Sequence, residues 1–220
     1  MILRFYFGIA EAALVYDSSF FGATSPILGQ RYRIEASLAV GSVTYYNAIA
    51  DYRRYFLPLR PFTLAFRFLH YGRYGPGSED SRLYPLFIGY QRLVRGYNTN
   101  SFSAEECGQD GCQVYDRLIG SKMMVFNAEL RFPLFRVLGI GEGFYGVFPI
   151  EFNAFFDSGI AWRNGDKAWF LGGDRKPVSS AGIGLRANVF GYAILGLHLV
   201  HPFNRPQKDW HFQFTFSPGF

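Results

Sequence analysis

Apolar and polar residues alternate along most of the chain. Between residues 31 and 40, for example, the even positions are apolar or aromatic, while the odd positions include two arginines and a glutamate. Successive side chains of a strand point to opposite faces, so a period of two indicates a strand with one apolar and one polar face. The pattern recurs in nine segments, at 9–17, 31–40, 43–56, 62–68, 126–132, 151–157, 181–189, 193–199 and 210–220.

These segments form two groups, separated by a long stretch without alternation. Residues 1–71 are predicted to hold four strands and residues 122–220 five, within a single region that covers 1–220. Short turns join neighbouring strands, and Pro58 and Pro61 are predicted to lie in one of them because proline has no N–H to donate to a sheet. Residues 72–121 are rich in glycine and carry an apolar run at 84–89, which predicts a long loop that folds inward.

The composition indicates where such strands would lie. Aromatic residues make up 20% of the chain and charged residues 18%, and mean hydropathy is near zero at +0.02. No window of 18 consecutive apolar residues exists, which excludes a transmembrane helix. A membrane-spanning strand needs only about 10 alternating residues and keeps a polar lumenal face. The chain is therefore predicted to be all-β, an antiparallel transmembrane β-barrel with about nine strands.

A soluble β-sandwich is the alternative fold, since its strands also alternate. Its outward faces are usually denser in Lys, Glu and Thr, whereas the polar faces here carry opposed charges, glycines and single amides, as in a crowded lumen. The last strand also ends in aromatic residues, a pattern that resembles the C-terminal recognition signal of bacterial outer-membrane proteins, at Phe212, Phe214, Phe216 and Phe220. Both observations favour the barrel.

Charge distribution argues against a nucleic-acid partner. The formal net charge is +5, but the Lys and Arg residues form no basic run, and several stand in strands opposite Asp or Glu.

The first twelve residues end in a small-x-small triplet, yet their apolar stretch is short and interrupted by Arg4, which argues against a signal peptide. We expect the chain to begin inside a larger protein whose export signal lies upstream.

The chain has two cysteines, both in the long loop. A metal site would need two further ligands, and none lies nearby at a usual spacing, so no metal is expected. A short disulfide between Cys107 and Cys112 is predicted instead, contributing about 2 kcal/mol through loop closure. Such a bond forms in an oxidising compartment.

Three motifs occur in order along the chain, at 94–97 (VRGY), 127–133 (NAELRFP) and 155–159 (FFDSG). Together with the aromatic last strand they resemble the C-terminal barrel of the BamA/TamA superfamily, the bacterial surface antigens. The resemblance implies a sixteen-stranded barrel in the bacterial outer membrane, of which about nine strands are present here, and periplasmic POTRA repeats upstream. It also implies contact with outer-membrane lipid and the assembly of unfolded outer-membrane proteins, in which an unpaired strand edge templates an incoming strand. A two-partner secretion pore shares the loop motif and is the alternative function.

The loop motif suggests a specific contact. A guanidinium in a lumen with carboxylates of the right parity can form a bidentate pair, and Asp157 and Glu129 both point inward by the alternation, beside Gly159 of the third motif. Arg95 is expected to lock the loop in this way, unless it is one of many lumenal ion pairs without a special role. Glycine permits close backbone approach, and the flanking side chains can pack on the wall. The predicted locking residues are Val94, Arg95, Gly96 and Tyr97.

An outer-membrane enzyme is the third class considered. His198 and His211 share lumenal parity on neighbouring strands, but no Gly-x-Ser-x-Gly motif accompanies them. A lumenal histidine pair is more often hydrogen-bonded structure than a catalytic site. We therefore predict no catalytic residues, no cofactor and no enzymatic activity.

Overall fold

The computed structural model describes residues 6–102, 106–107, 113–205 and 208–218. Within them lie nine long strands, namely β1 (Phe7–Asp17), β3 (Pro26–Gly41), β4 (Tyr45–Leu59), β5 (Phe62–Tyr74), β8 (Lys122–Pro133), β9 (Ile150–Trp162), β10 (Val178–Val189), β11 (Ala193–Pro202) and β12 (His211–Pro218). The connections hold the two-residue strands β2 (Phe20–Phe21), β6 (Leu86–Phe87) and β7 (Ile119–Gly120) and the short helices η1 (Thr99–Ser101), α1 (Gln113–Asp116), α2 (Leu134–Val137) and η2 (Trp169–Leu171). The prediction of an all-β chain with about nine strands is confirmed.

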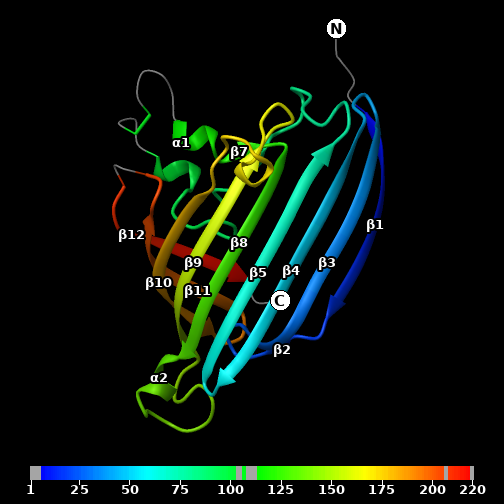
Figure 1. The fold of residues 1–220 in the computed structure, drawn as a ribbon. Helices are drawn as coiled ribbons and strands as arrows, with labels where there is room; N and C mark the ends of the chain where they lie inside the picture. The colour runs from blue at the N-terminus through cyan, green and yellow to red at the C-terminus, as the bar shows by residue number, and fades with distance from the viewer. Residues whose placement is uncertain (1–5, 103–105, 108–112, 206–207, 219–220) are drawn as a thin grey trace.

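The long strands form one curved sheet in chain order. Each pairs antiparallel with the next, giving β1-β3-β4-β5-β8-β9-β10-β11-β12, and β2 adds to β3. The long loop interrupts the hairpin between β5 and β8 without changing the strand order. In Figure 1, α1 and β7 of that loop lie at one end of the sheet and α2 at the other.

The two faces of the sheet differ as the alternation predicted. In β3, Ile34 and Leu38 are exposed, whereas Glu35 and Ser37 between them are buried. The same division holds in β9, where Phe156 is exposed and Asp157 is fully buried. One face therefore presents apolar and aromatic side chains outward, and the other gathers charges and amides on the concave side.

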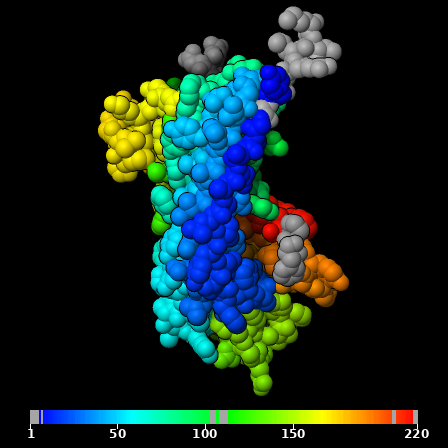
Figure 2. Space-filling model, turned by 90° about the vertical axis from the view of Figure 1, so that its right-hand side faces the viewer, coloured from blue at the N-terminus to red at the C-terminus, as the bar shows by residue number. Residues whose placement is uncertain are grey.

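The sheet is open between its first and last strands. Among the described residues, β1 pairs only with β3 and β12 only with β11. Figure 2 views the molecule at the β1 edge and shows this strand uncovered along its length. The hydrogen-bonding groups of both edges are therefore available to further strands.

The long loop packs on part of the concave face and builds the main core. Strand β5 continues to Tyr74, so the loop occupies residues 75–121. Its apolar side chains pack against the inner sides of β5, β8, β9 and β10 in one cluster of buried residues, Leu69, Leu86, Ile88, Val94, Tyr97, Leu118, Met123, Val125, Ala161 and Val178. Burial of this set stabilises the inward-folded loop through the hydrophobic effect.

One turn differs from the sequence prediction. Pro58 lies inside β4, and the reversal is made by Arg60 and Pro61. The pairing of β4 with β5 shifts register between Phe56 and Leu59, so Pro58 sits at an irregularity where no ladder hydrogen bond is required of it.

Among the described residues, none of the helices has the length and apolarity needed to cross a membrane.

Candidate functional site

The loop motif at 94–97 is buried at the centre of the concave face. A turn at residues 90–96 brings it there, with the Val94 amide donating to the carbonyl oxygens of Ile88 and Tyr90 at 3.2 and 3.1 Å. All four residues of the motif are buried, and Val94 and Tyr97 are fully so. The turn therefore directs a cation and its two apolar neighbours onto the sheet.

Arg95 makes a forked contact with Asp157 of β9. Its Nε and Nη2 atoms donate to the two carboxylate oxygens at 2.7 and 2.8 Å, and its backbone amide donates to the same carboxylate at 3.2 Å. A third pair joins Arg95 Nη2 to Glu129 Oε1 of β8 at 2.8 Å. The guanidinium also lies 3.5 Å from the centre of the Phe155 ring. One loop side chain thus binds two neighbouring strands through carboxylates.

The two carboxylates have different surroundings. Asp157 is fully buried and accepts one further hydrogen bond, from Asn127 Nδ2 at 2.8 Å. Glu129 accepts from Arg131 and Arg186 as well as Arg95, at 2.7 and 2.6 Å. Asp157 therefore depends on Arg95 for its charge balance, while Glu129 is shared among three cations.

Burial and charge oppose each other at Arg95. Burial alone would lower the pKa of its guanidinium, but the carboxylates of Asp157 and Glu129 outweigh this and raise the pKa. The side chain stays charged under all ordinary conditions. Its contact with the wall is therefore a permanent ion pair, whose attraction is strong because little water screens it.

Two glycines allow the motif to approach the wall closely. Gly96 has φ +88°, a conformation that favours glycine, and a Cβ there would lie 3.0 Å from Val200. Gly159 faces the motif from β9, where a Cβ would lie 2.7 Å from Val94 Cγ2. Any side chain at Gly159 would therefore displace the loop. The absence of a side chain at Gly159 leaves room for Val94 to pack next to the contact between Arg95 and Asp157.

Tyr97 and Gly96 attach the motif to two further strands, β10 and β12. The Tyr97 hydroxyl donates to the Ser179 carbonyl oxygen of β10 at 2.8 Å, and the Gly96 amide donates to Gln213 Oε1 of β12 at 3.3 Å. Burial raises the pKa of Tyr97 to about 12, so the hydroxyl remains a neutral donor. The motif thereby contacts β8, β9, β10 and β12.

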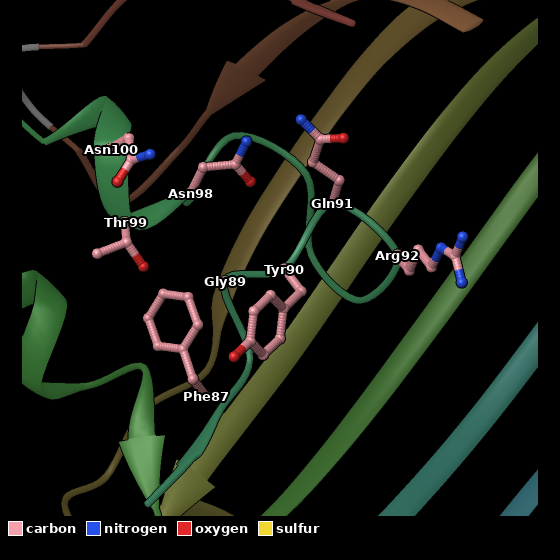
Figure 3. Close-up of a pocket in the computed structure, with 8 residues that line it drawn as sticks. All are labelled: Phe87, Gly89, Tyr90, Gln91, Arg92, Asn98, Thr99 and Asn100. Carbon is pink, nitrogen blue, oxygen red and sulfur yellow. The ribbon is translucent and has the colours of Figure 1, made fainter. Parts of the chain in front are cut away.

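The same loop borders an open hollow. Its volume is about 500 Å³, and Figure 3 shows the Phe87 and Tyr90 rings side by side while Arg92 extends toward the neighbouring strands. The two rings meet edge to face, with centres 5.2 Å apart. Amide and hydroxyl groups complete the lining, from Gln91, Asn98, Thr99 and Asn100.

The remaining candidates lie outside this site. Cys107 is disulfide-bonded, but Cys112 lies outside the described residues, so their pairing stays a prediction. Phe212, Phe214 and Phe216 of the last strand are exposed on the outer face. Phe220 lies outside the described residues. His198 is buried beside Phe155, and His211 begins β12, where its Nδ1 atom lies 3.1 Å from the Asp209 carbonyl oxygen. No group of metal-ligating side chains occurs among the residues that the structure describes.

Several residues of the site were not anticipated from the sequence. Arg131 and Arg186 share the lumenal parity of their strands, so alternation placed them on the correct face but not against Glu129. Gln213 has the same parity on β12. Arg205, in the β11–β12 connection, donates to the Gly96 carbonyl oxygen at 2.7 Å. No sequence pattern indicated it, since it lies outside every alternating segment.

Comparison with known proteins agrees with this geometry. The model of the Omp85 superfamily domain matches residues 16–220. No curated protein sequence matches the chain. Among solved structures, BamA from Haemophilus ducreyi lacking POTRA domains 1–3 aligns with a TM-score of 0.67 and 19% identity, over 96% of this chain and 42% of that one. The chain thus spans less than half of that structure and shares its fold, and by its domain match it belongs to the Omp85 superfamily.

Proposed function

We propose that the chain forms the C-terminal part of a barrel in the bacterial outer membrane, and that this barrel inserts other outer-membrane proteins. POTRA repeats are expected upstream, and unfolded outer-membrane proteins are the expected substrates. The observation that carries the proposal is the buried Arg95 contact with Asp157 and Glu129, because it holds a family motif at the centre of the lumen. Membership in the Omp85 superfamily supports the same function.

The outer face supports a membrane location. Large apolar side chains are exposed on successive strands, including Phe68, Phe126, Ile183 and Phe214. So large an apolar surface is unfavourable in water and favourable against lipid. Arg67 of β5, Glu129 of β8 and Arg186 of β10 are instead turned to the concave face, where they form ion pairs.

The strand edges support insertion. Among the described residues β1 and β12 each leave one side unpaired, and an unpaired edge can template an incoming strand by main-chain hydrogen bonds. The Gly96 contact with Gln213 joins the loop to β12, one of these two edges. The loop is therefore placed to stabilise an edge strand while substrate pairs with it.

The test is an insertion assay with the full-length protein that contains this chain, refolded into liposomes. A urea-unfolded eight-stranded outer-membrane protein is added, and its folded fraction is followed over time by heat-modifiable migration on a gel. We expect faster folding than in empty liposomes and a clear loss of that gain in Arg95→Ala. The matched control is Arg163→Ala, because Arg163 is an exposed arginine between β9 and β10.

The outcomes separate the candidate functions. Equal folding rates with and without the full-length protein would refute the insertion proposal. A secretion pore would instead give steady ion conductance in a planar bilayer without accelerating the folding of added barrels. Arg95→Ala and Arg163→Ala behaving alike in an active preparation would show that the lock has no part in insertion.

A further inference from the structure

The connection between β11 and β12 contains a second buried arginine that faces the loop. Arg205 is 2% exposed, although it belongs to a short connection at the end of the sheet. Buried arginines are rare unless each donor finds an acceptor, because the desolvated charge is otherwise costly. Its partners therefore indicate what the residue does.

Among the described residues, the side-chain hydrogen bonds of Arg205 go to Gly96 of the motif and to the loop segment that follows it. Its Nη1 atom donates to the Gly96 carbonyl oxygen at 2.7 Å, and Nη2 donates to the Ser101 carbonyl oxygen at 2.8 Å. Its Nε and Nη2 atoms form a forked pair with the two Glu106 carboxylate oxygens at 3.0 and 2.9 Å. The guanidinium lies 4.0 Å from the centre of the Phe102 ring.

The two buried arginines hold the motif from opposite sides. Arg95 extends from the loop to the sheet, whereas Arg205 extends from the β11–β12 connection to the loop, and the carbonyl that Arg205 binds belongs to Gly96, the residue after Arg95. Gly96 is also the residue with a left-handed backbone, so its orientation decides where the Arg95 side chain points. Fixing that carbonyl therefore fixes the guanidinium on Asp157.

We propose that Arg205, together with Glu106, is a positioning residue that holds the Gly96 backbone and so keeps Arg95 seated on its carboxylates. The lock then has two anchors, one on β8 and β9 and one on the hairpin of the edge strand β12. Loss of the Arg205 anchor frees the motif while leaving Asp157 and Glu129 intact. The proposal rests on the inward lock described under the proposed function, but its test needs no insertion activity.

The test measures opening of the motif by trypsin, which cleaves after arginine. Arg95 is buried in the closed loop, so cleavage after it reports opening, while cleavage after Arg33 in the middle of β3 reports unfolding of the sheet. The rates are measured by mass spectrometry on liposome-refolded protein. In Arg205→Ala we expect the rate at Arg95 to rise about tenfold or more, with the rate at Arg33 unchanged.

Matched variants sharpen the comparison. Arg205→Lys keeps the charge but not the planar fork, and is expected to open less than Arg205→Ala. Arg163→Ala removes an exposed arginine and should match the parent. Glu106→Gln keeps the shape of the partner side chain and should open the motif severalfold. This last variant carries the test if Arg205→Ala does not fold.

Two results would overturn the assignment. One is a rate at Arg95 within about twofold of the parent in Arg205→Ala or, where that variant does not fold, in Glu106→Gln. The other is an equal rise at Arg95 and Arg33, which would make Arg205 a general stabiliser of the fold. Failure of the insertion assay would leave these cleavage rates as they are, so the two proposals fail separately.

Discussion

Arg95 and Asp157 are expected to respond unequally to truncation, although they form one pair. Arg95→Ala leaves a fully buried Asp157 carboxylate whose remaining side-chain partner is Asn127. Asp157→Ala leaves a guanidinium that is still paired with Glu129 at 2.8 Å. The first change therefore creates an uncompensated buried charge, and the second leaves a partly compensated one.

The magnitudes follow from this difference. Removing one member of a buried pair typically costs about 3 to 5 kcal/mol. We expect Arg95→Ala near the upper end of that range and Asp157→Ala near the lower end, at about 3 kcal/mol. The double variant leaves neither charge stranded, so its cost should fall below the sum of the single costs by about 2 to 3 kcal/mol.

The assay is urea unfolding of detergent-refolded protein followed by tryptophan fluorescence, with Arg163→Ala as the exposed-arginine control. The free energy of unfolding of the Arg163→Ala control should lie within about 0.5 kcal/mol of that of the parent. Strict additivity of Arg95→Ala and Asp157→Ala would refute the reasoning, because side chains that share two hydrogen bonds must be energetically coupled.

Four further predictions concern the fold and the loop. Circular dichroism of refolded protein should show a β-sheet spectrum, and a mainly helical one would contradict the fold. Thiol titration of unreduced, denatured protein should find no free thiol, whereas two reactive thiols would exclude pairing of Cys107 with Cys112. Gly159→Ala should cost about 1 to 3 kcal/mol through the clash with Val94, and Val94→Ala should recover part of it in the urea assay. The free energy of unfolding should fall as pH rises from 10 to about 12, because the unfolded state loses the Tyr97 proton first. Urea titrations across that range should show a smaller fall for Tyr97→Phe, which has no such proton.

Alternation along the chain was sufficient to predict the strands and their faces. One face of the sheet is buried, so the residue type is constrained at every second position, and the division seen at Ile34 and Glu35 is repeated along β8, β9 and β10. Parity also placed Asp157 and Glu129 on the concave side. Their closeness to Arg95 was predicted with the help of the motif resemblance. Alternation alone predicts the face to which a side chain points, but not which residues of the loop and the strands lie at the same level.

Contacts between loops could not be predicted in the same way. The pairing of Arg205 with Glu106 joins residues 99 positions apart, and neither residue belongs to a periodic segment. Ser25 donates to Glu151 of β9 at 2.8 Å from a turn between β2 and β3, across a similar separation of 126 positions. Such contacts depend on how the sheet curves and on which loops then meet, and local sequence carries no record of either.

Strand direction sets a counting rule for the complete barrel. The nine long strands alternate in direction through eight antiparallel pairings, so β1 and β12 run the same way. Joining these two edges directly would require a parallel pair, with slanted hydrogen bonds. An all-antiparallel barrel instead needs an odd number of additional strands between them, and the seven that would complete a sixteen-stranded family barrel satisfy this. A second copy of the same nine strands also supplies an odd number, but two copies inserted in the same direction across the membrane would meet at two parallel seams.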